Sequence, residues 1–173
     1  MIKLPIGADI NNIIDDLRSF SWEASDILMH FSNLIKNNKN HKNIVQFKDK
    51  NNPVTLADLR VNEKIIQRIN QNYSRFGWKI LSEENLNLEA NHFNKYSDWL
   101  WVIDPLDGTK DFIQGTGNYA MHLALNYRNR PFLGVVLIPS KNELWFSDGE
   151  KAWCEKWNGY KEEKKLTQNK SLN

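Results

Sequence analysis

The spacing of apolar residues changes abruptly near the middle of this 173-residue chain. From Ile10 to Ile35, and again from Thr55 to Tyr73, apolar residues recur every three or four positions, which is typical of one face of an amphipathic helix. From Trp78 onward they recur every second position or in short runs, which is typical of strands. The chain is therefore predicted to form two long helices followed by a sheet.

Six short apolar runs make up the predicted sheet, namely residues 78–81, 99–103, 119–127, 132–138, 143–146 and 152–157. Short polar connectors join the last four runs, which favours hairpins and a largely antiparallel sheet. Two helices followed by such a meander predict an α+β fold, with both helices on one face of a sheet of about six strands. We expect a single domain over residues 1–160 and a disordered tail over residues 161–173, which are mostly polar.

Composition argues for a globular domain in a reducing compartment. The chain is 40% hydrophobic, and its net charge of +2 is a near balance of 23 basic and 21 acidic residues, so nucleic-acid binding is not indicated. The single cysteine, Cys154, excludes an internal disulfide and is predicted to be a buried thiol. The sequence has neither a signal peptide nor an apolar run long enough for a membrane span, so a cytoplasmic location is expected.

The strongest indication of chemistry is the hexapeptide Asp-Pro-Leu-Asp-Gly-Thr that begins at Asp104. Asp104 and Asp107 end an apolar run; the proline between them fixes φ, and the glycine after them permits a tight turn. Both carboxylates can therefore face one small volume, which is the oxygen-rich environment that Mg²⁺ needs. The amides of Gly108 and Thr109 follow where a turn or helix begins, so they can face an anion beside the metal.

Two further acidic positions are predicted to join this site. Glu83 and Glu84 follow another short apolar run, and if that strand lies beside the one ending in Asp104, several carboxylates converge at one edge of the sheet. Such crowding of like charges is costly unless cations are present. Asp58 follows a predicted N-cap, Thr55, and lies on the apolar stripe of the second helix. It either faces the site or complements the helix dipole as a first-turn aspartate.

Three motifs, in this order, resemble those of the inositol monophosphatase superfamily of Mg²⁺-dependent, lithium-sensitive phosphatases. They are PVTLAD at residues 53–58, SEE at 82–84 and DPLDGT at 104–109. The continuation TKDF at 109–112 resembles the bacterial 3′(2′),5′-bisphosphate nucleotidase branch, because Lys and then an acid follow the Thr. The resemblance covers residues from about 9 to 157 and implies the first layer of the sugar phosphatase fold.

This resemblance implies two or more Mg²⁺ ions. Glu83, Asp104 and the backbone carbonyl of Leu106 would hold one ion, while Asp104 and Asp107 would hold a second. It also implies a substrate-binding group made of Glu83, Asp107, Gly108, Thr109 and Lys110. The Thr109 hydroxyl, oriented by Asp58, would help to deprotonate the attacking water. For Lys110 a plain surface charge is the alternative to a phosphate contact. No catalytic role is predicted for His30, His92 or His122, because none has a second ligand at metal spacing.

The activity implied is removal of the 3′-phosphate from 3′-phosphoadenosine 5′-phosphate in sulfur metabolism, and a broader inositol-type phosphatase is the alternative enzyme. The partner would be a small phosphate ester, with no nucleic acid and no membrane. The sequence departs from the family in lacking the Trp-Asp-x-Ala motif of a C-terminal α/β layer, since the nearest match is Trp157-Asn158-Gly159. A rival expectation is therefore a catalytically inactive fragment that binds metal weakly or needs a complementing chain. A homodimer, or other self-association through the face left uncovered, is a further expectation.

Overall fold

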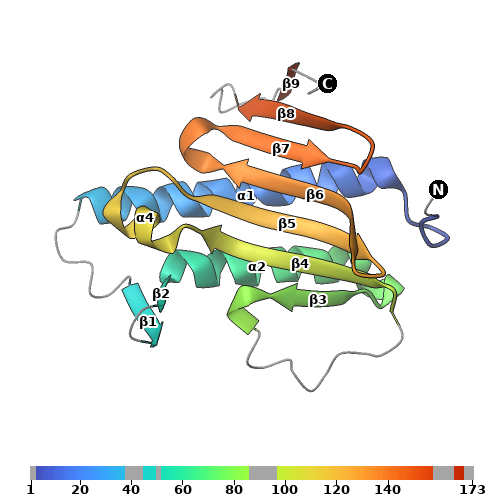
Figure 1. Cartoon of the computed structure of the whole chain (residues 1–173), viewed down its shortest axis with the longest axis horizontal. Coiled ribbons are helices and arrows are strands. Elements are labelled where there is room, and N and C mark those ends of the chain that lie inside the picture. The colour runs from blue at the N-terminus through green and yellow to red at the C-terminus, as the bar shows by residue number, and fades with distance from the viewer. Residues whose placement is uncertain (1–2, 38–44, 50–51, 86–96, 158–165, 170–173) are drawn as a thin grey trace.

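Two long helices lie side by side across one face of a single large sheet (Figure 1). They are α1 (Ile10–Asn37) and α2 (Leu56–Tyr73). The sheet has seven strands in the order β3–β4–β5–β6–β7–β8–β9, in which β3 is parallel to β4 and the other neighbours are antiparallel. The predicted α+β fold is confirmed. These elements come from a computed structural model that describes residues 3–37, 45–49, 52–85, 97–157 and 166–169.

The strands alternate between buried and half-buried residues, as a period of two predicts. In β5 the buried positions are Met121, Leu123 and Leu125, which belong to the same core as the apolar stripes of α1 and α2. The bounds of the strands are Lys79–Ser82 (β3), Trp99–Asp107 (β4), Ala120–Tyr127 (β5), Arg130–Ile138 (β6), Glu143–Ser147 (β7), Ala152–Trp157 (β8) and Leu166–Asn169 (β9).

Side chains cap the starts of both long helices. Asp9 Oδ1 accepts hydrogen bonds of 2.9 and 3.0 Å from two amides in the first turn of α1, as an N-cap should. Thr55 Oγ1 accepts a bond of 3.1 Å from the amide of Ala57 at the start of α2. The Asp58 carboxylate accepts from the Thr55 amide at 2.8 Å, which completes a capping box. The start of α2 is therefore fixed by the same aspartate that the sequence singled out.

Two parts of the sheet architecture differ from the sequence prediction. A separate antiparallel hairpin, β1 (Val45–Asp49) with β2 (Asn52–Thr55), leads directly into α2 and was not predicted. Strand β9 pairs with β8 within the expected disordered tail, so that expectation is wrong for residues 166–169. A four-residue edge strand is held by backbone hydrogen bonds to its neighbour, so its polar sequence gave no sign of it. The remainder of the predicted tail lies outside the described residues.

The remaining elements are short. A 3₁₀ turn at Glu83–Asn85 follows β3, and α4 (Thr109–Gln114) follows β4, where the sequence indicated a turn or helix. Cys154 is buried in β8, as predicted. Among the described residues, no helix combines the length and apolar character that crossing a membrane requires. The single-domain boundary at residue 160 stays a prediction.

Two isoleucines allow a matched test of this packing. Ile65 on α2 is fully buried in the core, whereas Ile6 before α1 is fully exposed. We expect Ile65→Ala to lower the free energy of unfolding by about 2 to 5 kcal/mol, because it leaves a cavity between helix and sheet. Ile6→Ala should change it by less than about 0.5 kcal/mol. Denaturant unfolding of both variants checks this, and equal losses would contradict the packing described.

Candidate active site at the edge of the sheet

Four segments meet at one edge of the sheet: the ends of β3 and β4, the first turn of α2, and the start of α4 (Figure 1). Strands β3 and β4 run parallel with Ser82 opposite Ile103. Glu83, the first residue after β3, and Asp104, the next residue of β4, therefore lie side by side. The structure thus brings together the two acidic segments that were predicted to converge.

Asp104 is the electrostatic centre of this edge. Burial raises the pKa of its carboxyl above the ordinary value, and the negative charge of Asp107 raises it further. Interactions with His122, the Leu106 amide and Glu83 act in the opposite direction. Asp104 is therefore a half-buried acid in contact with two other carboxylates, an arrangement that a cation would stabilise.

The donor chemistry of this edge fits a hard divalent cation. Carboxylate oxygens come from Glu83, Asp104 and Asp107, and the Leu106 carbonyl lies in the same turn. Within the described ranges, no three His, Cys, Asp or Glu side chains already converge as a metal cage. Asp107 is 61% exposed, so its side chain has room to move towards a shared ion. The residues therefore fit a metal that draws its ligands together on binding.

A tight turn after β4 sets the position of these acids. The pairing of β4 with β5 shifts register between Asp104 and Asp107, and the Leu106 amide donates to Asp104 Oδ1 at 3.2 Å. Gly108 has φ +81°, and a Cβ at this position would lie 2.7 Å from the carbonyl oxygen of Asn118. Only glycine fits there without displacing backbone, which explains the Asp-Gly sequence in physical terms.

Asp58 and Thr109 join the acidic edge to α2. Asp58 is only 3% exposed, and its Oδ1 lies 3.5 Å from Thr109 Oγ1. The same hydroxyl donates to the Leu106 carbonyl at 3.1 Å, while Thr55 Oγ1 donates to Asp58 Oδ2 at 2.6 Å. Burial raises the pKa of Asp58 to about 6. The hydrogen bonds from Thr55 lower this pKa, but the effect of burial is larger. Both alternatives for Asp58 hold at once, because one oxygen caps the helix and the other faces Thr109.

The remaining predicted substrate group lies at the start of α4. Gly108 is the residue before this helix, and Thr109 and Lys110 form its first turn. Lys110 is exposed and lies three residues after Asp107. That position suits either a phosphate contact or a plain surface charge, so the role of Lys110 stays a prediction.

His122 is a site residue that sequence reasoning missed. It lies on β5 directly opposite Asp104 in the ladder. Its Nδ1 is 4.0 Å from Asp104 Oδ2, and its Nε2 is 4.0 Å from Asp107 Oδ2. The sequence did show that His122 alternates with the buried apolar residues of β5, so its side chain was expected on the other face of the sheet. The strand register that aligns it with Asp104, however, cannot be read from one sequence. Of the other three histidines, His30 is exposed on α1, while His41 and His92 lie outside the described residues.

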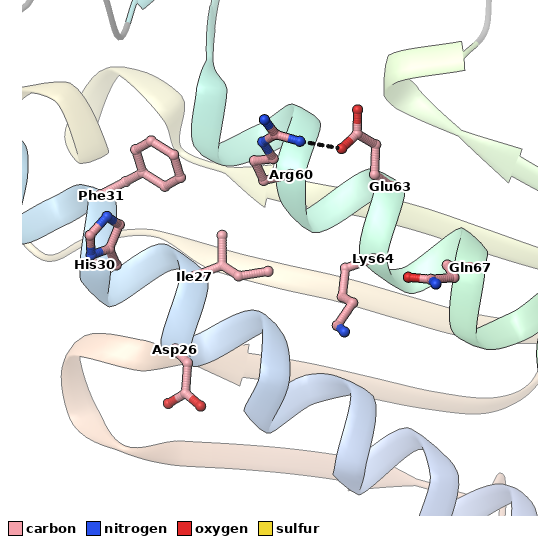
Figure 2. Close-up of a pocket in the computed structure, with 8 residues that line it drawn as sticks. All are labelled: Asp26, Ile27, His30, Phe31, Arg60, Glu63, Lys64 and Gln67. Carbon is pink, nitrogen blue, oxygen red and sulfur yellow. Dashed lines mark hydrogen bonds and ion pairs between the residues drawn. The ribbon is translucent and has the colours of Figure 1, made fainter.

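Figure 2 shows a hollow of about 540 Å³ between α1 and α2 that is separate from the acidic edge. Its rim carries charges of both signs, and Arg60 is paired with Glu63 at 3.0 Å. A hollow with compensated charges and no nucleophile or acidic cluster does not suggest catalysis. The lining residues are Asp26, Ile27, His30, Phe31, Arg60, Glu63, Lys64 and Gln67.

Known proteins resemble this chain in both sequence and fold. The nucleotidase CysQ of Salmonella typhimurium is 33% identical over 110 residues, 62% of this chain and 42% of that protein. The Nus factor SuhB of Pasteurella multocida is 39% identical over 98 residues, 57% of this chain and 34% of that protein. A solved IMPase/NADP phosphatase, complexed with NADP and Ca²⁺, has a TM-score of 0.69 at 21% identity, over 88% of this chain and 53% of that one.

These comparisons bear on family and fold and leave the branch open. The chain spans less than half of the length of the two curated relatives, and they carry different names, so neither gives its substrate to this chain. The model of the inositol monophosphatase family matches residues 15–173. This range includes the three motifs, at residues 53–58, 82–84 and 104–109, and the whole acidic edge. The chain belongs to the inositol monophosphatase family, a family of phosphatases.

Proposed function

We propose that this chain carries the metal-binding and water-activating part of a Mg²⁺-dependent phosphatase site, with 3′-phosphoadenosine 5′-phosphate as substrate and AMP as product. The observation that carries the proposal is the hydrogen-bonded connection from buried Asp58 through Thr109 to the Leu106 carbonyl, next to Asp104. It links a proton acceptor to a group of carboxylates suited to metal ions. Phosphate ester hydrolysis needs both.

The metal would be held by Glu83, Asp104, Asp107 and the Leu106 carbonyl. When bound, a divalent cation supplies positive charge that activates water and neutralises the phosphate oxygens. Burial and, to a lesser extent, the charge of Asp107 raise the pKa of Asp104, which supports this assignment because a cation would favour the ionised carboxylate. The Ca²⁺ in the solved IMPase/NADP phosphatase supports a divalent ion of this class, and Mg²⁺ is the ion that we propose.

Asp58 and Thr109 would move the proton. Thr109 Oγ1 lies between two acceptors, Asp58 Oδ1 and the Leu106 carbonyl, so it can pass its proton to Asp58 while it takes one from a water molecule. With a pKa of about 6, Asp58 is mostly ionised at pH 7 and still accepts a proton readily. Its second oxygen is held by Thr55 in the capping box, which fixes the orientation of the carboxylate.

The choice of substrate rests on the relatives and on the residues after Thr109. The CysQ relative is a 3′(2′),5′-bisphosphate nucleotidase, and Lys110, in the first turn of α4, would give a second phosphate of such a substrate a cationic contact. A broader inositol-type phosphatase is the alternative enzyme, supported by the family model. The third alternative is a chain that binds metal but turns over substrate only with a complementing chain. Self-association of this chain is also part of the proposal. A cytoplasmic location is part of the same proposal.

Removing one carboxylate tests the metal site. We expect Asp104→Asn to weaken Mg²⁺ binding by at least about tenfold and to abolish phosphate release, since a central ligand is lost. The matched control is Asp98→Asn just before β4, which removes an exposed ion pair with Arg128 and should alter neither quantity. Calorimetric titration with Mg²⁺ and a phosphate assay give the two readouts. Equal behaviour of the two variants would contradict the assignment.

A comparison of substrates tests the branch. The chain with Mg²⁺ should release phosphate from 3′-phosphoadenosine 5′-phosphate at least about tenfold faster than from inositol monophosphate, because the second phosphate adds charged contacts. The assay compares initial rates at equal substrate concentration. Faster cleavage of inositol monophosphate would favour the broader phosphatase, and metal binding without turnover of either ester would favour the complemented chain.

The buried Asp58 predicts a dependence of stability on pH. Its folded pKa of about 6 lies above the ordinary value of 3.8, so folding favours the protonated form. This contribution to stability is fully present below pH 3.8 and is lost as the pH rises through 6. Between pH 4 and pH 7.5, the free energy of unfolding should fall by roughly 2 kcal/mol relative to Asp58→Asn, which cannot ionise.

The measurement is denaturant unfolding of both proteins across this pH range with a chelator present. A constant difference between wild type and Asp58→Asn would show that Asp58 does not titrate as described. The same variant should lower phosphate release by about 100-fold or more, because the proton acceptor is lost.

A further inference from the structure

His122 is placed against both metal-ligating aspartates, yet the proposed function leaves it without a role. Its side chain is 43% exposed and lies on the half-exposed face of β5, so the ring borders solvent on the site side of the sheet. One ring nitrogen faces Asp104 and the other faces Asp107. A histidine that bridges two carboxylates in this way is either an ion-pair partner or a ligand of the same metal.

Neither contact is a hydrogen bond in this structure. Each nitrogen is 4.0 Å from its carboxylate oxygen, which is longer than a hydrogen bond between an imidazole and a carboxylate, about 2.7 to 3.2 Å. The gap between Nε2 and Asp107 Oδ2 would close if both side chains moved towards a shared cation. The exposed side chain of Asp107 permits such a movement.

We propose that His122 is a ligand of the metal ion held by Asp107, binding it through Nε2, while Nδ1 faces Asp104 and would donate to it once the ring shifts on binding. This inference rests on the proposed function, because it assumes that Asp104 and Asp107 hold metal. The arrangement matches a general rule, since a histidine that ligates a metal usually donates its other N–H to a carboxylate. Here Asp104 is that carboxylate.

An imidazole ligand changes which ions the site prefers. Oxygen-only sites suit Mg²⁺, whereas a nitrogen ligand favours Mn²⁺, Co²⁺ and Zn²⁺. His122 therefore adds affinity for these transition metals to a site whose oxygen ligands still bind Mg²⁺. It is a determinant of metal specificity that belongs to this chain's own β5, and the residue-by-residue resemblance to the family did not indicate it.

The test compares metal affinities of the whole chain and of His122→Asn, which keeps a polar side chain of similar reach without the imidazole. We expect His122→Asn to weaken Co²⁺ and Zn²⁺ binding by at least about tenfold and to change Mg²⁺ binding by less than about threefold. The matched control is His30→Asn, because His30 is exposed on α1 away from the site. It should leave all three affinities unchanged.

A spectroscopic readout separates ligation from a structural effect. The visible absorption of bound Co²⁺ should shift in His122→Asn, because a nitrogen ligand is replaced, and circular dichroism should confirm that the variant is folded. If the variant unfolds, His122→Gln provides the same comparison. Unchanged Co²⁺ spectra and affinities in the folded variant, or equal weakening of Mg²⁺ and Co²⁺ binding, would overturn the proposal.

Asp104→Asn distinguishes this inference from the proposed function. If Asp104→Asn abolishes binding of Mg²⁺ and Co²⁺ while His122→Asn changes neither, the metal site stands and His122 is not a ligand. If Asp104→Asn alters neither ion, the proposed metal site itself is wrong. Selective loss of Co²⁺ and Zn²⁺ in His122→Asn supports both.

Discussion

Mutual repulsion among the carboxylates at the end of β4 is the constraint on which this site depends. The parallel pairing of β3 with β4 places Glu83 beside Asp104, and the register shift in β4 places Asp107 three residues later, at the end of the strand. No gain in packing explains placing three acids together at a sheet edge, where burial first and the charge of Asp107 next raise the pKa of Asp104. Leu106, which is only 2% exposed, anchors the backbone between the two aspartates.

Asp58 illustrates how one residue can serve stability and chemistry together. Its hydrogen bonds to Thr55 complete the capping box of α2, and a cap of this kind contributes about 1 kcal/mol to helix stability. Its burial opposes ionisation, which costs more than the cap contributes once the pH exceeds 6. Because a first-turn aspartate could cap the helix without being buried, the burial is best explained by the contact with Thr109.

Much of this could be predicted because local physics fixed it. The helical period of 3.6 residues predicted that Asp58 lies on the buried stripe of α2. The turn could be predicted from the Asp-Pro-Leu-Asp-Gly sequence, because Pro105 and Gly108 restrict and permit particular φ values. His122 could not be predicted, because its position opposite Asp104 depends on a register that one shifted residue would change. Strand β9 was missed for a related reason, since backbone pairing with β8 decides it rather than its own side chains.

The sheet has a second face, and the site belongs to it. The helices α1 and α2 lie on one side (Figure 1), so the buried positions of β5 point to them and the half-buried positions point away. Along one cross-strand row on that other face, Asp104 is followed by His122, Val136 and Trp145. In this row the polar side chains of Asp104 and His122 are directly followed by the apolar side chains of Val136 and Trp145. Any layer that buried Val136 and Trp145 would therefore also border His122 and Asp104, which couples covering this face to excluding water from the site.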